Sequence, residues 1–304
     1  MTETVDEHAT RVFADHRELL FSVVYNMLGS VADTEDVLQE TWLSWVARHR
    51  GDTDEIEHPR AYLVRIAVNQ ALARRAVINR RRETYVGTWL PEPLVTDLPV
   101  GDGGEDAAAP ALRAESVSMA MLVVLETLTP LERAVFVLHE VFGYPHTDIA
   151  EILGRSVTAT RQLAHRAREH VHARRPRCRV DPGVQRRVTE EFLVAQMDGD
   201  LAGLLALLAP DVTFWSDADG KQRAALRPVQ GRDKVARLIT SQVVRSHVPD
   251  FGVGYRFVNG DPSALILSAG ALFAVLVLDI DPSTERIKGI YAIANPDKLT
   301  RIDT

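Results

Sequence analysis

The stretch Leu128–Ala173, LTPLERAVFVLHEVFGYPHTDIAEILGRSVTATRQLAHRAREHVHA, contains three successive helical patterns separated by two short breaks. The first break runs from Gly143 to Pro145, and a second, short helix surrounds Ile149–Leu153. A turn after Leu153 then places Ser156 as the N-cap of the third helix. Two helices joined by a tight turn that contains glycine form a helix-turn-helix, whose second helix enters the major groove of DNA.

The third helix of this stretch carries side chains that suit a recognition helix. Arginine can pair with guanine, and glutamine with adenine, through two hydrogen bonds each. A basic amphipathic helix can also be a solvated surface helix, but the turn before it favours DNA binding. The residues that we expect to contact duplex DNA are Thr158, Thr160, Arg161, Gln162, His165 and Arg166.

The charge distribution indicates a second contact with nucleic acid. The whole chain of 304 residues has a net charge of −7, which argues against indiscriminate binding to polyanions. Nevertheless, Arg60–Arg82 contains seven arginines and no acidic residue, and Arg155–Arg179 contains eight arginines and one glutamate. Two basic segments in an acidic chain predict phosphate contacts at two places.

Composition excludes some classes of protein. The single cysteine, Cys178, rules out an internal disulfide and agrees with a reducing compartment. The longest apolar run, Ala271–Leu278, is too short to span a bilayer. We therefore expect a soluble, cytoplasmic protein without membrane contacts.

The N-terminal third contains three helical patterns. The first covers Val12–Leu28 and the second covers Ser30–Arg48, where we expect Asp33 to begin a capping box. The third begins at His58-Pro59-Arg60, because proline is tolerated in the first turn of a helix. The second helix has an apolar face and an opposite acidic face, which alone could simply be solvated. The polar residues of that face are Asp33, Asp36, Gln39 and Glu40.

Two motifs here, DTEDVLQETWLSWV (33–46) and HPRAYLVRIAVNQALARR (58–75), resemble region 2 of extracytoplasmic-function sigma factors, and Leu128–Ala173 resembles their region 4. The resemblance implies that the acidic face docks on the clamp helices of the β′ subunit of core RNA polymerase, with the β subunit as a further contact. It also implies that the third helix melts and contacts the −10 promoter element, while the helix-turn-helix recognises the −35 element. The residues implied for −10 DNA are Arg60, Tyr62, Arg65, Asn69, Arg74 and Arg75.

Composition changes after the basic segment of the third helix. Gly87–Pro110 is rich in proline, glycine and alanine, which predicts an extended or disordered linker. The motif WLPEPL (89–94) is unusual for a linker, because exposed tryptophan and leucine side chains usually dock on another surface. It resembles the linker signature of a sigma-factor group with a fused C-terminal domain, often called sigma-J-like.

The last 125 residues show helical patterns first and strand patterns later, which predicts an α+β domain with an antiparallel sheet. FLVAQMDGDLAGLLALLAPDVTFWSD (192–217) resembles SnoaL-like members of the nuclear-transport-factor-2-like cone fold. Residues 217–221 lie where the sigma-J-like group has DGGGK, and residues 295–299 match its NPDKL tail. By this resemblance, the contacts between domains that regulate the protein involve Trp89, Leu90, Pro91, Asp217, Gly220, Lys221, Asn295, Pro296, Asp297, Lys298 and Leu299.

The predicted architecture is multidomain, with two all-α sigma domains followed by an α+β SnoaL-like cone domain. The expected boundaries are 1–86 for region 2, 87–112 for the linker, 113–176 for region 4 and 180–304 for the C-terminal domain. The predicted function is that of a sigma factor regulated in cis, without a catalytic site, metal or cofactor, although the pocket of a cone fold could take a small ligand.

Two alternatives stay open at this level. A two-component-type or LuxR-type regulator would use the same helix-turn-helix, but it would lack the −10 module predicted at Asp33–Arg82. Alternatively, the C-terminal domain could be a SnoaL-like enzyme whose N-terminal part only controls its own gene. The candidate acid–base groups are Asp198, Asp217, Asp219 and His247, and the candidate pocket walls are Trp215 and Tyr255.

Overall fold

The computed structural model describes residues 5–51, 56–96, 117–173, 180–241 and 250–302, which form two compact units. The first unit contains the described residues up to Glu83 together with Val117 and the residues from Val124 to Ala173. The second unit contains Thr84–Thr96, Ser118–Val123 and the described residues from Val180 onward. Segments of the linker therefore belong to the same unit as the C-terminal domain.

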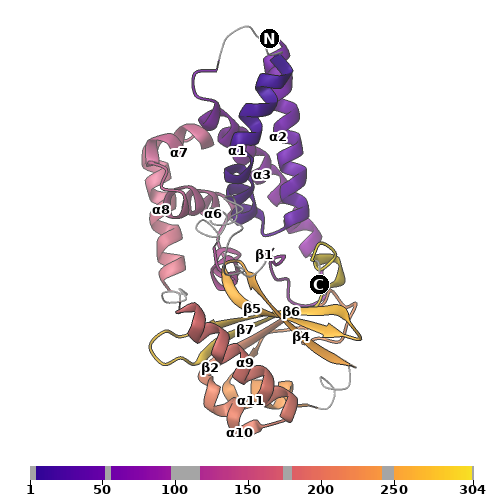
Figure 1. The fold of residues 1–304 in the computed structure, drawn as a ribbon. Coiled ribbons are helices and arrows are strands. Elements are labelled where there is room, and N and C mark those ends of the chain that lie inside the picture. Colours follow the sequence, from indigo (N-terminus) through magenta and orange to yellow (C-terminus); the bar gives the residue numbers. More distant parts are fainter. Residues whose placement is uncertain (1–4, 52–55, 97–116, 174–179, 242–249, 303–304) are drawn as a thin grey trace. The chain divides into compact units, whose positions relative to one another are not determined.

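Three long helices begin the first unit: α1 (Val5–Leu28), α2 (Val31–Gly51) and α3 (Pro59–Arg82), and each packs on the other two (Figure 1). Their shared core includes the indole of Trp45, which is fully buried and donates from Nε1 to the Ala9 carbonyl at 2.9 Å. The prediction that Asp33 begins a capping box is wrong. The side chain of Ser30 accepts a hydrogen bond from the Asp33 amide at 3.2 Å, so α2 begins three residues earlier than a cap at Asp33 would allow.

The helix-turn-helix part of the first unit consists of α6 (Pro130–Phe136), a π-helical continuation (Val137–Val141), α7 (His146–Leu153) and α8 (Val157–His172). A capping box between Thr129 and Glu132 starts α6. Gly154 ends α7 in the left-handed conformation (φ 61°), which glycine adopts without the steric penalty of a Cβ atom. Ser156 caps α8 by accepting from the Ala159 amide, as predicted.

The second unit contains a seven-stranded sheet in the order β1-β4-β5-β6-β7-β2-β3. The strands are β1 (Val95–Thr96), β2 (Leu208–Asp217), β3 (Val229–Gln230), β4 (Phe251–Val258), β5 (Asp261–Ser268), β6 (Ala271–Ile280) and β7 (Ile287–Ile293). All neighbouring strands are antiparallel except β2 and β7. The prediction of an antiparallel sheet is therefore wrong at this pair, whose long connection through four other strands permits a parallel alignment.

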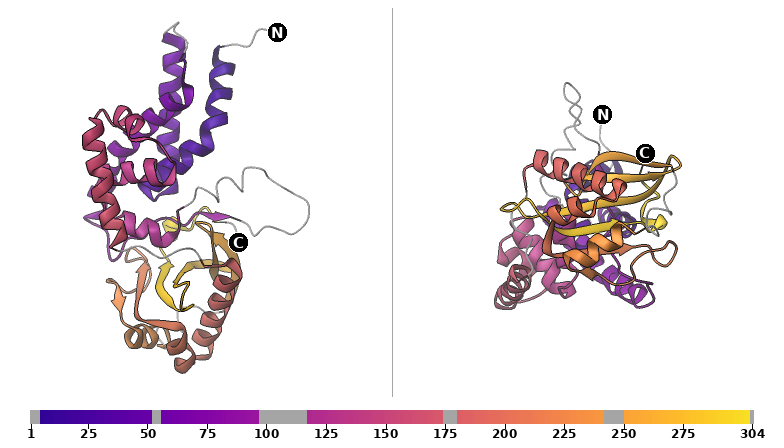
Figure 2. Two further views of the ribbon diagram at one scale, coloured as in Figure 1. Left: turned by 90° about the vertical axis from the view of Figure 1, so that its left-hand side faces the viewer. Right: turned by 90° about the horizontal axis from the view of Figure 1, so that it is seen from below.

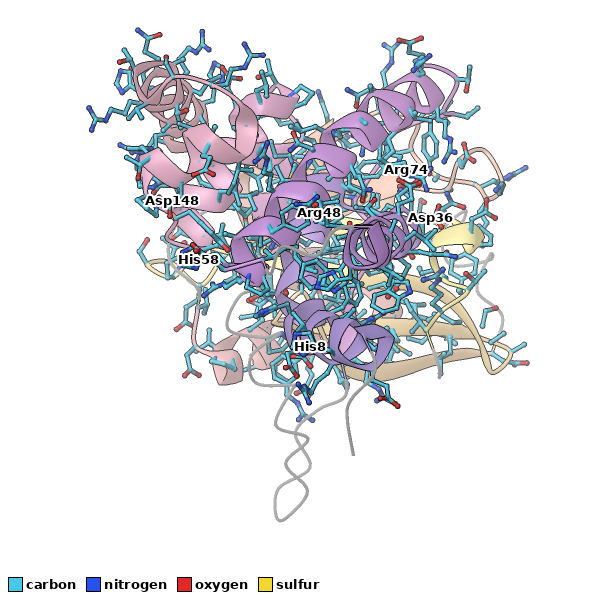
Figure 3. All side chains as sticks on the ribbon, turned by 90° about the horizontal axis from the view of Figure 1, so that it is seen from above. His8, Asp36, Arg48, His58, Arg74 and Asp148 are labelled. Atoms are coloured by element: carbon cyan, nitrogen blue, oxygen red, sulfur yellow. The ribbon has the colours of Figure 1, made fainter. Side chains whose placement is uncertain are left out.

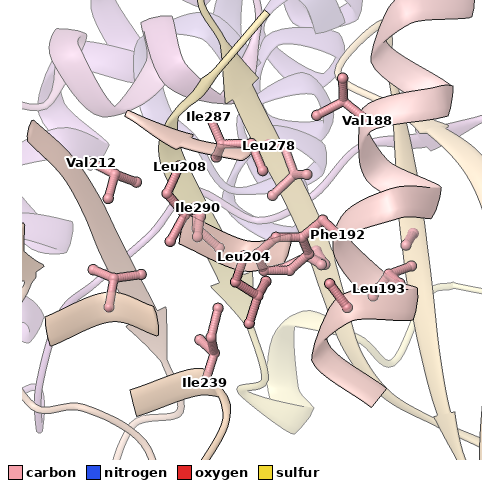
Figure 4. Close-up of a cluster of buried hydrophobic side chains, with 14 of the residues drawn as sticks. Val188, Phe192, Leu193, Leu204, Leu208, Val212, Ile239, Leu278, Ile287 and Ile290 are labelled. Atoms are coloured by element: carbon pink, nitrogen blue, oxygen red, sulfur yellow. The ribbon is translucent and has the colours of Figure 1, made fainter. Parts of the chain in front are cut away.

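Helices cover one face of this sheet. They are α9 (Pro182–Asp198), α10 (Leu201–Leu207) and α11 (Arg232–Ile239), and Figure 2 shows α9 and α11 in front of the strands in the view from below. The core beneath them is aliphatic and aromatic, with Phe192 of α9 among Leu204, Leu278 and Ile290 (Figure 4). The predicted α+β class of the C-terminal domain is confirmed.

The opposite face of the sheet packs against the linker, the start of α5 (Met119–Leu125) and the C-terminal tail. Leu90 of the linker, Met119 in the first turn of α5 and Leu299 near the C-terminus share a core with Val275 and Tyr291. The linker also adds β1 to the edge of the sheet beside β4. The described part of the predicted linker, up to Thr96, therefore packs on the sheet, and the rest of the predicted linker, from residue 97 to 112, lies outside the described residues.

Candidate nucleic-acid interface

The recognition helix α8 has a buried face and an exposed polar face. Leu163, Ala164, Ala167 and Val171 are buried against the rest of the helix-turn-helix. Of the six residues predicted to contact duplex DNA, five are exposed: Thr158, Arg161, Gln162, His165 and Arg166. The sixth, Thr160, is fully buried, and its hydroxyl donates to the Ser156 carbonyl at 3.1 Å. Thr160 therefore stabilises the first turn of α8.

Helix α3 carries the residues predicted to contact −10 DNA, and they differ in accessibility. Arg60 and Arg65 are exposed, and Tyr62 is half-buried with its ring centroid 5.9 Å from that of Trp45. The amide of Asn69 donates to the Arg65 carbonyl at 2.8 Å and to the Ile152 carbonyl at 3.2 Å. A side chain that the resemblance implies for −10 DNA is thus hydrogen-bonded to the end of α7.

The last two of these residues, Arg74 and Arg75, are bound to acidic groups of the first unit. Arg74 bridges Asp33, at 3.2 Å from its Nε, and Asp36. Figure 3 labels Arg74 and Asp36, which lie close together. Arg75 is only 4% exposed, and it pairs with Glu126 and donates to the Leu28 carbonyl at 3.0 Å. These two arginines are therefore held by protein groups rather than presented to solvent.

The acidic face of α2 is partly engaged by these ion pairs. Asp36, Gln39 and Glu40 are exposed, whereas the side chain of Asp33 is 14% exposed. Because Asp33 and Asp36 also orient Arg74, the acidic face of α2 and the basic helix α3 are electrostatically linked. Gln39 and Glu40 lie one turn further along α2 and extend this face.

In the second unit, the carboxylate of Asp217 at the end of β2 contacts two segments that are distant in sequence, residues 85–90 and the C-terminal tail. It is completely buried and accepts hydrogen bonds from the Leu90 amide at 2.7 Å and from the Tyr85 hydroxyl. Lys298 lies 2.7 Å from the same carboxylate, with its ammonium 4.0 Å from the centre of the Trp89 ring. The structure therefore brings together the WLPEPL motif, the end of β2 and the NPDKL tail.

The loop after Asp217 adopts the conformation that glycine would favour, although two glycines of the DGGGK pattern are replaced. Asp219 has φ 48° and Gly220 has φ 67°. Aspartate is among the residues that tolerate this left-handed region. The Asp219 carboxylate accepts from the Val86 amide at 3.3 Å, and Lys221 pairs with Asp297. The departures from DGGGK thus leave the loop in contact with both the linker and the tail.

Tyr85 was missed by the sequence analysis, which placed the linker motif at Trp89 and beyond. Its hydroxyl donates to Asp217 and accepts from the Asn295 side chain at 2.8 Å. Burial, with the Asp217 carboxylate as a second cause, raises the pKa of this phenol well above its ordinary value, so the hydroxyl stays a donor. The only signal in the sequence was an aromatic residue shortly after the arginine run.

Three of the four predicted acid–base candidates, Asp198, Asp217 and Asp219, lie among the described residues. Asp198 is exposed at the end of α9, Asp217 is ion-paired with Lys298, and His247 lies outside the described residues. Trp215 stacks on Tyr291 at the linker-covered face, whereas Tyr255 packs at the helix-covered face. Among the described residues, no three histidine, cysteine or acidic side chains are placed to share a metal ion. No helix within these residues has the length and apolar character needed to cross a membrane.

Comparison with known proteins identifies the modules. Residues 12–83 match the family model "Sigma-70 region 2", and residues 118–171 match "Sigma-70, region 4". The chain is 40% identical to ECF RNA polymerase sigma factor SigJ of Mycobacterium tuberculosis over 93% of this chain and 91% of that protein. It is 32% identical to the probable ECF RNA polymerase sigma factor SigI of the same species over 93% and 92% of the two chains.

The crystal structure of the Mycobacterium tuberculosis SigJ protein matches with a TM-score of 0.72 and 35% identity, over 95% of this chain and 97% of that one. The similarity extends through the C-terminal domain as well as the two sigma regions. It favours a sigma factor over both a LuxR-type regulator and a SnoaL-like enzyme with an autoregulatory part. The chain therefore belongs to the extracytoplasmic-function (ECF) RNA polymerase sigma factors.

Proposed function

We propose that this sigma factor docks on the β′ clamp helices through α2, opens the −10 element with α3 and recognises the −35 element with α8. The exposed Asp36, Gln39 and Glu40 support the docking face. The exposed Arg161 and Gln162 support base recognition by α8, because both side chains can form paired hydrogen bonds with base edges. Arg60 and Arg65 support contact with the backbone of a separated strand.

We further propose that the C-terminal domain controls the sigma modules in cis by holding the linker. The observation that carries this proposal is the completely buried Asp217, which accepts from Leu90 of the linker and from Tyr85 just before it, and which pairs with Lys298 of the tail. A buried carboxylate is stable only when its charge is paired and its lone pairs are hydrogen-bonded. The C-terminal domain supplies the buried carboxylate, and Tyr85 and Leu90 supply hydrogen-bond donors that it needs.

Docking of the linker has a direct consequence for the sigma modules. The linker connects region 2 to region 4 in the chain, so the length of free chain between the modules decreases when residues 85–96 are bound to the sheet. A shorter tether restricts the separations that two modules can reach. The two promoter elements must be contacted together, so linker docking sets whether both contacts are possible.

The test is run-off transcription with core polymerase, together with a separate measurement of core binding. Tyr85→Phe removes one donor to a buried carboxylate, which we expect to weaken linker docking roughly tenfold. Transcription should change by a similar factor while affinity for core polymerase stays constant. Removal of residues 295–304 should change output in the same direction.

Tyr255→Phe is the matched control, because Tyr255 packs at the helix-covered face of the sheet. Equal output from wild type, Tyr255→Phe, Tyr85→Phe and the truncated chain would rule out control through the linker. A small ligand for the C-terminal domain stays a prediction, which thermal-shift screening of the whole protein can test.

A further inference from the structure

Glu126 lies at the centre of a cluster of three arginines within the first unit. Arg75 Nη2 is 2.5 Å from its carboxylate, and Arg82 and Arg133 also form ion pairs with it. Glu126 directly follows α5 and precedes α6, so it belongs to the helix-turn-helix part of the chain. Arg75 and Arg82 belong to α3, which makes the cluster a bridge between the two sigma modules.

The cluster is deeply buried. The side chains of Arg75, Arg82 and Glu126 are 5%, 18% and 14% exposed, and that of Arg133 is 1% exposed. Within the described residues, no group hydrogen-bonds Nη2 of Arg133. The carboxylate of Glu126 thus joins two arginines of α3 to one arginine of α6.

The three arginines keep the Glu126 carboxylate charged. Burial alone would raise the pKa of Glu126, but the charges of Arg133, Arg75 and Arg82 outweigh it and hold the pKa far below its ordinary value. Burial lowers the pKa of Arg133 to about 10, although the Glu126 charge opposes this effect. Glu126 is therefore a permanently charged group at neutral pH.

Two further contacts join the same modules. Arg133 donates from Nε to the Asn26 carbonyl of α1 at 2.8 Å, and the Asn69 amide donates to the Ile152 carbonyl of α7 at 3.2 Å. Polar groups make all these bridges, and water or phosphate can satisfy the same groups after separation. A bridge of this kind suits a reversible contact better than a permanent core.

We propose that Glu126 is an intramolecular mimic of a DNA phosphate that holds the two sigma modules together by occupying the arginines of α3. This proposal rests on the proposed function of α3 and α8 as the two promoter-contacting helices. Carboxylate and phosphate oxygens accept the same paired N–H donors of arginine. The modules must separate before Arg75 can contact a phosphate and before Asn69 can contact a base, so DNA and Glu126 compete for one surface.

The experiment measures the separation of the modules in the free protein by double electron–electron resonance. Spin labels are placed at Glu18→Cys in α1 and Glu151→Cys in α7, both at exposed positions, in a chain with Cys178→Ser. Glu126→Gln keeps the shape of the side chain and removes its charge. Loss of one partner from a buried ion pair should raise the ratio of separated to joined modules at least about tenfold.

A second bridge variant and a matched control make the result decisive. Arg82→Gln removes one bridge from α3 but leaves the Glu126–Arg133 pair inside the helix-turn-helix module, so it tests the proposal even if Glu126→Gln impairs folding. Glu140→Gln breaks an ion pair of 2.7 Å with Arg168 that lies within the helix-turn-helix module, and it should leave the distance distribution unchanged.

The outcomes separate this proposal from the proposed function. Longer distances in Glu126→Gln and Arg82→Gln, but not in Glu140→Gln, support the bridge. A distance distribution identical to that of the wild type in Arg82→Gln would overturn it, whatever the transcription assay shows. Failure of the wild-type chain to support promoter-specific transcription would overturn the proposed function and leave the distance measurement intact.

Discussion

The Lys298→Met variant tests the linker-binding site most sharply. Lys298 forms the buried ion pair with Asp217 at 2.7 Å, donates to the Leu90 carbonyl and lies over the Trp89 ring. Methionine keeps most of the length of the side chain but removes the charge. Asp217 would then keep the Leu90 amide and the Tyr85 hydroxyl as donors, but its negative charge would be unpaired in a fully buried position.

The expected loss follows from the burial of this pair. Removing one partner of a buried ion pair costs about 3–5 kcal/mol. The two donors that remain place the loss at the lower end, so we expect about 3 kcal/mol, which corresponds to roughly a hundredfold weaker linker docking. The cost falls on the docked state, because Asp217 can be hydrated when the linker is released.

Hydrogen exchange at the Leu90 amide reports this equilibrium directly, since that amide donates to Asp217. Exchange in Lys298→Met should be about a hundredfold faster than in the wild type, in line with the expected loss of docking. Lys288→Met is the control, because Lys288 pairs with Asp281 at 2.7 Å and its side chain is 40% exposed. Exchange at Leu90 that differs by less than about threefold between wild type and Lys298→Met would refute the reasoning.

Three further predictions concern other parts of the molecule. Replacing Arg161 and Gln162 by alanine should lower transcription that depends on the −35 element roughly tenfold or more, since each paired base contact contributes about 1–3 kcal/mol of discrimination, and unchanged promoter selectivity in run-off assays would contradict this. Lysine at both Asp36 and Glu40 should abolish binding to core polymerase without altering the circular dichroism spectrum, whereas retained binding would exclude this face of α2. Burial, and secondarily the nearby Asp261, raises the pKa of Asp279 to about 6, so the protonated form favours the folded state and the free energy of unfolding should fall as pH rises from about 4 to 6. Thermal unfolding should show that Asp279→Asn lacks this fall relative to the wild type, and identical pH profiles would contradict the assigned cause.

Local patterns in the sequence predict most of the helices and strands. The helix-turn-helix follows from a glycine that can adopt positive φ and a serine that caps α8, and both act within a few residues of the chain. The sheet strands follow from alternating and continuous apolar runs. The parallel pairing of β2 with β7 could not be predicted this way, because it depends on which distant strand completes the edge of β2.

The site residues show the same division between local and distant effects. The exposed face of α8 follows from its helical periodicity, and Thr160 differs because its hydroxyl bonds to its own first turn. Burial of Arg75 could not be inferred, since it depends on Glu126, a residue 51 positions away. Tyr85 likewise gains its role only when the chain brings it to Asp217 and Asn295.

The most direct test of the account is run-off transcription by core polymerase and this protein on templates with a randomised upstream region. Sequencing the templates that yield transcripts shows which DNA positions the protein selects. We expect two selected blocks at a fixed spacing, with Arg161→Ala and Gln162→Ala relaxing only the upstream block. A single selected block, or selection that is unchanged by both substitutions, would contradict the claim that α3 and α8 contact two separate promoter elements.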